Sequence, residues 1–224
     1  FQWIPNSNKY VYYTDMWSKM MVASTSDNKA TELLSLKEVN ANLGTTLRHF
    51  FGTSWIDTNT ILVSENGNYY SYSLASKSGK KTIETPEIAE NQTFDKIKSN
   101  LAFTEANNLY YINSNNQKIA VTNESDKAIV SGQAIARSEF GIVGGIFWSP
   151  KSTYLAFYQK DETEVADYPL LDINETPGKL ESIKYPMIGQ KSEKPKVGIY
   201  NLATGKTVFI APRNNSDDYL TNLA

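Results

Sequence analysis

The sequence predicts an all-β fold organised as part of a β-propeller, and three observations lead to that prediction. The segment Trp3–Tyr13 recurs as Trp148–Tyr158, each copy opening with Trp and Pro before a polar turn and an apolar-aromatic strand. Such recurrence is typical of repeat proteins. Fourteen of the 224 residues are Tyr, which favours strands over helices. Tyr70, Tyr72 and Leu74 alternate with small residues after an Asn-Gly pair, as in a strand that leaves a hairpin turn.

The first two units can be followed strand by strand. The first unit is expected to hold strands at Tyr10–Tyr13, Met20–Thr25 and Glu32–Leu36. A second unit begins at Trp55 and runs through Ile61–Val63 to a hairpin turn at Glu65–Asn68, because Asn-Gly tolerates the positive φ of a tight turn. The alternating strand that follows this turn is expected to end at Ser78–Lys80.

The third and fourth units follow the same plan. Their strands are expected at Leu101–Phe103, Leu109–Ile112, Lys118–Val121 and Ile146–Trp148, with a closing hairpin at Val197–Ile210. A long polar insertion from Asp161 to Lys196 interrupts the fourth unit. Helical periodicity is weak and confined to Glu32–Val39 and Asp95–Ser99. Units of about 50 residues with three or four short strands each fit propeller blades better than a sandwich.

Residues 1–224 are therefore expected to form about four blades of a larger protein. The apolar segment Leu220–Ala224 stands where a further blade would begin. Open blade ends leave unpaired strand edges, which favour association. A homodimer is thus one expected assembly.

Composition excludes several classes of function. The chain has 40% hydrophobic residues, enough for a sizeable core. A net charge of −2 without any run of Lys or Arg argues against nucleic acid as a partner. The absence of Cys excludes disulfides and thiol catalysis, and with a single His it leaves no common zinc site. No cofactor or metal is expected.

Candidate catalytic groups are scarce. His49 is the only possible imidazole base, and a lone His beside Phe50 and Phe51 is interpreted as structural. No G-x-S-x-G segment provides a nucleophilic serine. The acidic groups at Asp161–Glu164 and Asp217–Asp218 lie in polar segments and are interpreted as solvated loops. The chain therefore contains no nucleophile and base pair.

Glu139 is the most distinctive acid. It is followed by ten residues without charge, Phe140 to Ser149, so its carboxylate is expected where the chain enters a buried strand. In such a partly desolvated place a carboxylate would bind an ammonium group more strongly than in water. An ion pair with Arg137, or an ordinary acid at a blade edge, is the alternative interpretation.

The residues around Glu139 resemble those of a known family. Arg137–Ile142, Gly145–Pro150 and Leu155–Tyr158 are similar to the N-terminal β-propeller of the dipeptidyl peptidase IV family of serine exopeptidases. Two later segments, Lys184–Gly189 and Lys196–Lys206, are most similar to its bacterial prolyl tripeptidyl peptidase branch. The resemblance is strong from about Asp95 onward and loose before it.

This resemblance implies an eight-bladed propeller that caps an α/β-hydrolase domain carrying Ser, Asp and His. That domain is absent from residues 1–224, so the fragment itself is expected to be inactive. The resemblance further implies a periplasmic or secreted enzyme that releases Xaa-Pro or Xaa-Xaa-Pro from peptides with a free N-terminus. Glu139 falls on the carboxylate that binds the substrate's α-ammonium group, a charge-assisted contact that an acylated N-terminus cannot make. Ser138 is a second candidate contact.

Two departures from the family pattern favour tripeptide release. The dipeptidyl members commonly carry two adjacent acids, whereas Ser138 occupies the first position here. They also have a long hairpin with a substrate-holding Arg, whereas the matching hairpin closes at Asn66-Gly67 and no Arg lies between Ile61 and Lys80. Both changes imply a roomier site. The alternative is a non-catalytic propeller that binds another protein or a surface polymer.

Overall fold

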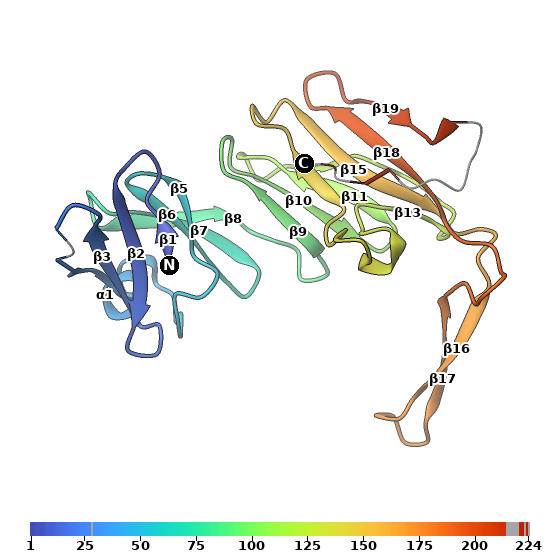
Figure 1. Ribbon diagram of the computed structural model, residues 1–224, viewed down its shortest axis with the longest axis horizontal. Helices are drawn as coiled ribbons and strands as arrows, with labels where there is room; N and C mark the ends of the chain where they lie inside the picture. Colours follow the sequence, from blue (N-terminus) through green and yellow to red (C-terminus); the bar gives the residue numbers. More distant parts are fainter. Residues whose placement is uncertain (28, 214–219, 222, 224) are drawn as a thin grey trace. The chain divides into compact units, whose positions relative to one another are not determined.

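The computed structural model in Figure 1 describes residues 1–27, 29–213, 220, 221 and 223. Its regular structure is almost entirely antiparallel sheet, so the all-β prediction is confirmed. The chain divides into two compact units, Phe1–Glu87 with Ser114–Asn116, and Ile88–Asn113 with Gln117–Ala224. The acidic pair Asp217–Asp218 lies outside the described residues. Within the described part, no helix is long and apolar enough to cross a membrane.

The first unit contains two four-stranded sheets. The first sheet has strands β1 (Gln2–Trp3), β2 (Lys9–Thr14), β3 (Lys19–Ser24) and β4 (Thr31–Ser35) in chain order, and the second has β5 (Ser54–Asp57), β6 (Thr60–Glu65), β7 (Asn68–Ser73) and β8 (Ser78–Ile83). Each strand pairs with the next through a short turn, which is the up-and-down plan of a propeller blade. The expected blade plan is therefore confirmed in this unit.

A short helix, α1 (Leu36–Leu43), follows β4 directly. The hydroxyl of Ser35 accepts the Glu38 amide at 3.3 Å as an N-cap, and Gly44 ends the helix with a φ of 68°. The strand expected at Glu32–Leu36 is thus confirmed as β4, whose backbone pairs with β3. The weak helical periodicity over Glu32–Val39 corresponds to a helix only from Leu36 onward.

Two turns of the second sheet can be compared with their prediction. Asn66 and Gly67 have φ of 49° and 78° and form the expected tight hairpin between β6 and β7. Ser78–Lys80 does not end β7 but opens β8, because Lys77 takes the left-handed conformation of the turn. Gly79 is needed for close packing, since a Cβ there would lie 2.3 Å from the Ser71 carbonyl oxygen.

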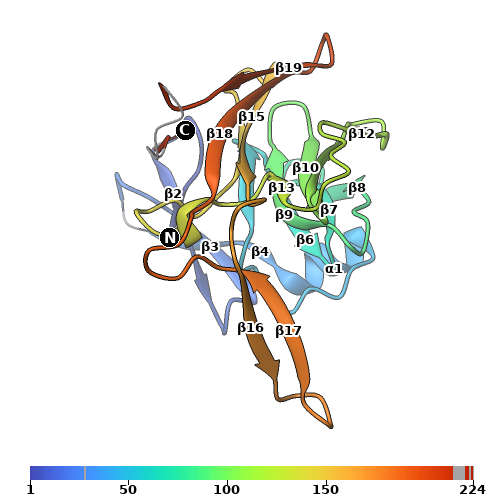
Figure 2. The same ribbon diagram turned by 90° about the vertical axis from the view of Figure 1, so that its right-hand side faces the viewer.

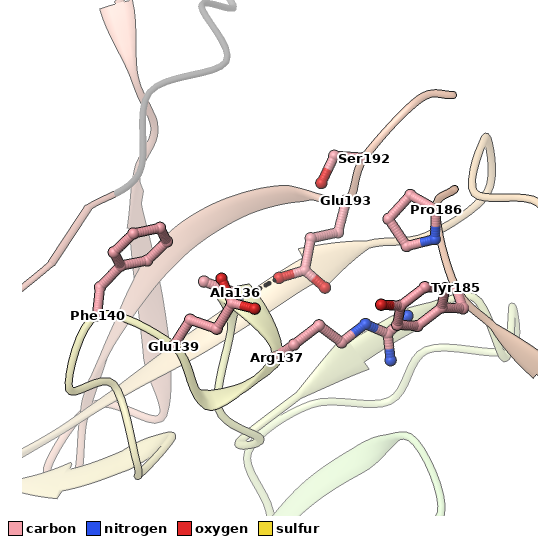
Figure 3. Close-up of a pocket in the computed structure, with 8 residues that line it drawn as sticks. All are labelled: Ala136, Arg137, Glu139, Phe140, Tyr185, Pro186, Ser192 and Glu193. Atoms are coloured by element: carbon pink, nitrogen blue, oxygen red, sulfur yellow. Dashed lines mark hydrogen bonds between the residues drawn. The ribbon is translucent and has the colours of Figure 1, made fainter. Parts of the chain in front are cut away.

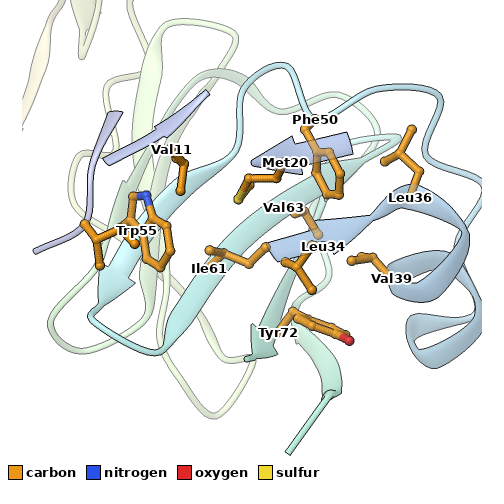
Figure 4. Close-up of a cluster of buried hydrophobic side chains, with 11 residues drawn as sticks. Val11, Met20, Leu34, Leu36, Val39, Phe50, Trp55, Ile61, Val63 and Tyr72 are labelled. Atoms are coloured by element: carbon orange, nitrogen blue, oxygen red, sulfur yellow. The ribbon is translucent and has the colours of Figure 1, made fainter. Parts of the chain in front are cut away.

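The core of the first unit lies between these two sheets and the helix. Figure 4 shows Met20 and Leu34 from the first sheet facing Ile61 and Tyr72 from the second, with Val39 of α1 beside them. All of these side chains are buried to 2% exposure or less. Burial of such side chains contributes about 1.5–3 kcal/mol each, so this cluster holds the two sheets together.

The second unit contains a four-stranded sheet, a five-stranded sheet and a separate hairpin. The four-stranded sheet consists of β9 (Glu90–Asp95), β10 (Asn100–Glu105), β11 (Asn108–Ile112) and β12 (Lys118–Ala120). The five-stranded sheet contains four neighbouring strands in the order β13 (Ile129–Ser131), β15 (Tyr154–Asp161), β18 (Lys194–Asn201) and β19 (Lys206–Ile210). Its fifth strand, β14 (Ile146–Trp148), also pairs with β15. The two sheets correspond to the predicted third and fourth units.

The weak helical periodicity at Asp95–Ser99 does not correspond to a helix, because the chain turns here between β9 and β10. The Asp95 carboxylate accepts the amides of Ile97 and Lys98 at 2.9 and 3.3 Å. Ser99 then takes a φ of 55° and redirects the chain into β10. An Asp side chain that bonds to the backbone two residues ahead competes with helix formation.

The predicted polar insertion contains structure of its own. Within it, β16 (Asp167–Asp172) and β17 (Lys179–Lys184) form a hairpin that extends away from the five-stranded sheet in Figures 1 and 2. Its base is fixed by Lys184, which pairs with Asp167 at 3.2 Å and donates to the Val165 carbonyl at 3.0 Å. The hairpin therefore leaves the sheet between β15 and β18 with a defined root.

The two copies of the repeated Trp-Pro segment share a strand–turn–strand plan, although positive φ falls on Asn6 in the first turn and on Ser152, the equivalent of Ser7, in the second. In each, Trp ends an outer strand, and the amide of the next residue bonds across the turn, Ile4 to Lys9 and Ser149 to Tyr154, both at 3.0 Å. The repeat is therefore structural, as the sequence predicted. Each copy is also bonded to a neighbouring sheet: the Pro5 carbonyl accepts the Thr58 hydroxyl at 2.9 Å in the first copy, and the Trp148 indole donates to the Thr93 carbonyl at 2.9 Å in the second.

Candidate functional site

Glu139 lies at the end of an unusual left-handed turn. A 3₁₀ turn, η1 (Ala136–Ser138), has φ of 51°, 53° and 61° at its three residues, and Phe140 follows with 55°. Glu139 itself is extended, with a φ of −77°. Residues other than Gly rarely adopt positive φ, and each one costs about 1–2 kcal/mol. The surrounding structure must therefore stabilise this turn.

Apolar side chains anchor the turn on both sides. Ile135 and Ala136 enter a buried cluster before the turn, and Ile142 enters it afterwards. Tyr158 of β15 and Val197 of β18 form the rest of this cluster. Within the turn, the Glu139 amide donates to the Ala136 carbonyl at 2.9 Å. The turn is thus held against the five-stranded sheet at both ends, while its middle projects outward.

The turn forms one wall of a pocket of about 190 Å³ (Figure 3). The opposite wall comes from the segment between the hairpin and β18. The lining residues are Ala136, Arg137, Glu139, Phe140, Tyr185, Pro186, Ser192 and Glu193. Aromatic rings and carboxylates thus face the same space.

Glu139 lines this pocket with its carboxylate uncompensated. Among the described residues, no donor or cation pairs with that carboxylate, and the side chain is exposed. Of the two alternative interpretations, the ion pair with Arg137 is wrong, because the Arg137 guanidinium instead lies 5.2 Å from the centre of the Tyr185 ring; the other, an ordinary acid at a blade edge, stays open. Figure 3 shows the two side chains leaving the turn in different directions. Within the described part of the chain, the Glu139 carboxylate thus faces solvent without a charged partner.

One part of the prediction for Glu139 has to be corrected. Glu139, Phe140 and Gly141 are exposed, and the strand that was expected to begin here begins only at Ile146. The carboxylate is thus on an open turn and not in a desolvated strand entry. Ser138, the second candidate contact, is also exposed, and its amide donates to the Ile135 carbonyl at 3.1 Å.

The buried acid of this region is Glu193, which directly precedes β18. One carboxylate oxygen, Oε1, accepts the Ala136 amide at 2.6 Å, as the dashed line in Figure 3 shows. The other, Oε2, lies 3.6 Å from Nζ of Lys160. Lys160 also pairs with Glu162 at 2.8 Å, and all three side chains are at most 10% exposed. Sequence reasoning missed this group, because Glu193 lies more than thirty positions after Lys160 and Glu162 in the chain.

The acidic segment Asp161–Glu164 is only partly the solvated loop that was expected. Glu162 is buried beside Lys160, which contradicts the expectation for that residue. Glu164 is partly exposed and pairs with both Lys191 and Lys194. These hydrogen bonds and charges lower the pKa of the Glu164 carboxyl from 4.5 to about 2. Glu162 therefore makes a buried ion pair, whereas Glu164, two residues later, makes exposed ones.

The candidate base His49 does not line this pocket. His49 is exposed and contacts the ring of Phe51 edge-on at 6.1 Å, in keeping with a structural role. Among the described residues, no group of three or more His, Asp or Glu side chains could hold a metal ion. Of the two carboxylates that line the pocket, that of Glu193 is already paired with Lys160, whereas that of Glu139 has no charged partner among the described residues.

Known proteins that resemble the chain share one family. The sequence profile of the "Dipeptidyl peptidase IV (DPP IV) N-terminal region" matches residues 57–224. Dipeptidyl aminopeptidase B of Saccharomyces cerevisiae is 24% identical over 172 residues, which are 73% of this chain and 21% of the yeast protein.

Solved structures give the same picture. A candidate dipeptidyl aminopeptidase IV from Bacteroides ovatus aligns with 100% of this chain and 31% of its own, at a TM-score of 0.86 and 33% identity. Porphyromonas gingivalis dipeptidyl peptidase 4 aligns with 94% of this chain and 32% of its own, at a TM-score of 0.68 and 18% identity, which indicates a common fold. The chain thus spans about a fifth to a third of the length of these relatives.

Proposed function

This chain belongs to the dipeptidyl peptidase IV family, as part of its N-terminal region, and from that premise we propose that it recognises substrate N-termini for a serine exopeptidase. The enzyme would release Xaa-Pro or Xaa-Xaa-Pro from peptides with a free N-terminus. Its Ser, Asp and His would reside in a C-terminal α/β-hydrolase domain of the same polypeptide. Residues 1–224 alone would be inactive.

The observation that carries this proposal is the carboxylate of Glu139 in the pocket, which has no charged partner among the described residues. Arg137, the nearest cation in sequence, is held on the Tyr185 ring and leaves the acid available. A substrate ammonium group would donate a charge-assisted hydrogen bond to this carboxylate, which is about twice as strong as a neutral one. The exposed ring of Phe140 offers an apolar surface for the first side chain of the peptide.

The test is Glu139→Gln in the full-length enzyme, with matched Xaa-Pro and Xaa-Xaa-Pro reporters that are free or N-acetylated. Gln keeps the shape but loses the charge, so kcat/KM for free-amine reporters should fall about 10- to 150-fold. Acetylated reporters, which carry no ammonium group, should be unaffected. Unchanged kcat/KM for the free-amine reporters would refute the role of Glu139.

The same reporters decide the length of the released peptide. We expect the Xaa-Xaa-Pro reporter to be preferred, since Ser138 replaces one acid and the Asn66-Gly67 hairpin is short. Preference for Xaa-Pro would place the enzyme with the dipeptidyl members. No cleavage of any reporter by a folded full-length protein would favour the alternative, a non-catalytic propeller scaffold.

Homodimer formation is the proposed assembly, and the hairpin β16–β17 supports it. Leu171 and Leu180 are opposite each other on this hairpin and are 64% and 71% exposed. A two-stranded hairpin with exposed apolar side chains and free edges is only marginally stable in water. In sedimentation experiments we expect a dimeric full-length enzyme that L171D/L180D converts to monomer; a dimer unaffected by that change would exclude this hairpin as the interface.

Periplasmic or secreted location is proposed from the family resemblance alone. Fractionation of cells that express the full-length gene would test it. Recovery of the enzyme solely in the cytoplasm would refute this location.

A further inference from the structure

We propose that Lys160 and Glu193 are positioning residues, which hold the left-handed turn so that Glu139 faces the pocket. The proposal rests on the proposed function of Glu139 as the amine-binding acid. Neither Lys160 nor Glu193 needs to touch the substrate in this role. Their action passes through the backbone of Ala136.

The turn needs such support because of its conformation. Ala136, Arg137, Ser138 and Phe140 all have positive φ, within five consecutive residues. A backbone of this kind persists only where neighbouring structure holds it, and it is concentrated at functional sites. The buried side chains of Ile135 and Ile142 fix where the turn begins and ends. They do not fix the direction of the peptide groups between them.

Glu193 supplies a polar contact at the start of the turn. Its Oε1 accepts the Ala136 amide at 2.6 Å, and the Ala136 carbonyl in turn accepts the Glu139 amide at 2.9 Å. A single residue therefore separates the Glu193 carboxylate from the backbone of Glu139. Loss of the Glu193 contact would leave a buried amide unsatisfied and allow the turn to relax.

Lys160 makes a buried carboxylate at position 193 tolerable. An unpaired buried charge is strongly unfavourable, so Glu193 requires a cation. Lys160 is well placed for this because β15 is a central strand, and Lys160 pairs with Val130 of β13 and Pro195 of β18. Glu162 holds the same ammonium group at 2.8 Å. The sheet thus determines the position of Lys160, and Lys160 determines that of Glu193.

The experiment measures kcat and KM of the full-length enzyme with free and N-acetylated reporters. For Glu193→Ala we expect KM of the free-amine reporter to rise roughly 5- to 10-fold, because the amine contact is weakened. Since that contact is made equally in the ground state and in the transition state, kcat should be unchanged. The acetylated reporter should not change. Glu193→Gln keeps an acceptor oxygen for the Ala136 amide, so its KM for the free-amine reporter should return most of the way to the wild-type value.

Two controls separate positioning from general stability. Glu105→Gln removes an acid that pairs with Lys118 elsewhere in the same unit, and it should leave both reporters unaffected. In the Glu139→Gln background, Glu193→Ala should produce no further loss of selectivity, because the two changes act on one contact. The proposal would be overturned if Glu193→Ala lowered kcat/KM equally for both reporters, or if its effect on amine selectivity added to that of Glu139→Gln in the double variant.

The conformation of the turn can be followed without substrate. Arg137 is exposed, so trypsin can cleave the bond between Arg137 and Ser138. Cleavage there should be faster in Glu193→Ala and Lys160→Met than in Glu105→Gln, and an unchanged rate in the first two variants would overturn the proposal. If Glu139→Gln itself leaves amine selectivity intact, the proposed function fails. If Glu139→Gln lowers selectivity and Glu193→Ala does not, only the positioning role fails.

Discussion

Ser152→Ala should destabilise the second unit far more than Ser7→Ala destabilises the first, although the two serines occupy equivalent positions of the repeated Trp-Pro segment. Ser152 is 1% exposed, and its hydroxyl donates to the Asp95 carboxylate at 2.5 Å. Asn100 donates to the same carboxylate at 2.8 Å, and two backbone amides complete its shell. Ser7 is exposed and bonds only within its own turn.

The expected magnitude follows from the type of hydrogen bond. A bond to a charged acceptor contributes about 1.5–3 kcal/mol, and Asp95 is only 2% exposed, so water cannot readily replace the hydroxyl. Ala keeps the Cβ, which leaves the strain at the positive φ of residue 152 unchanged. Loss of stability should therefore be about 1.5–3 kcal/mol for Ser152→Ala and within about 0.5 kcal/mol for Ser7→Ala.

The assay must report the two units separately, because one transition cannot be assumed for both. Hydrogen–deuterium exchange in increasing urea, followed in peptides from β9 and β15, gives the free energy of opening for the second unit. Peptides from β2 and β3 give it for the first. Equal effects of the two substitutions, or an effect of Ser152→Ala below about 0.5 kcal/mol, would refute the assigned role of the Asp95 carboxylate.

Two further predictions concern the sheet of the second unit. The pKa of Glu164 is about 2 against 4.5 for the free group, so its ion pairs should stabilise the fold fully above about pH 4.5 and lose that effect as the pH falls toward 2. The difference in unfolding free energy between the wild type and Glu164→Gln should therefore shrink over this pH range. A difference that stays constant would contradict the prediction. Gly198→Ala would place a Cβ 2.3 Å from Cζ of Phe157 and should lower stability by about 1–3 kcal/mol, whereas an unchanged urea midpoint would show that the ring can move away.

Local chemistry made most of the blade plan predictable. The Asn66-Gly67 turn and the alternation of Tyr70 and Tyr72 required no tertiary information, and both are found as expected. The strand β9 was missed because its sequence is mostly polar and only Phe94 suggests a buried face. Its position depends on pairing with β10, which a local pattern does not reveal.

The candidate site was predictable in part. Glu139 was identified from its isolation among uncharged residues, and the structure places it in the pocket. The expected desolvation belongs to Glu193 instead, which lies 54 positions later in the sequence and contacts Ala136 only in the folded chain. Lys160 lies near the end of β15, after a run of mostly apolar and aromatic residues. No pattern in the neighbouring sequence indicates that its ammonium group is buried between two acids.

Tyr185 belongs to two structures at once. It carries the Arg137 guanidinium in the pocket, and its amide donates to the Ala166 carbonyl at 3.0 Å, directly at the root of the hairpin. β17 ends at Lys184, so a single peptide bond joins the hairpin to the pocket wall. The backbone of β17 thus continues directly into the residue whose ring contacts Arg137. Anything that contacts Lys184 at the end of β17 would therefore lie one residue from the ring that holds the Arg137 guanidinium beside the pocket.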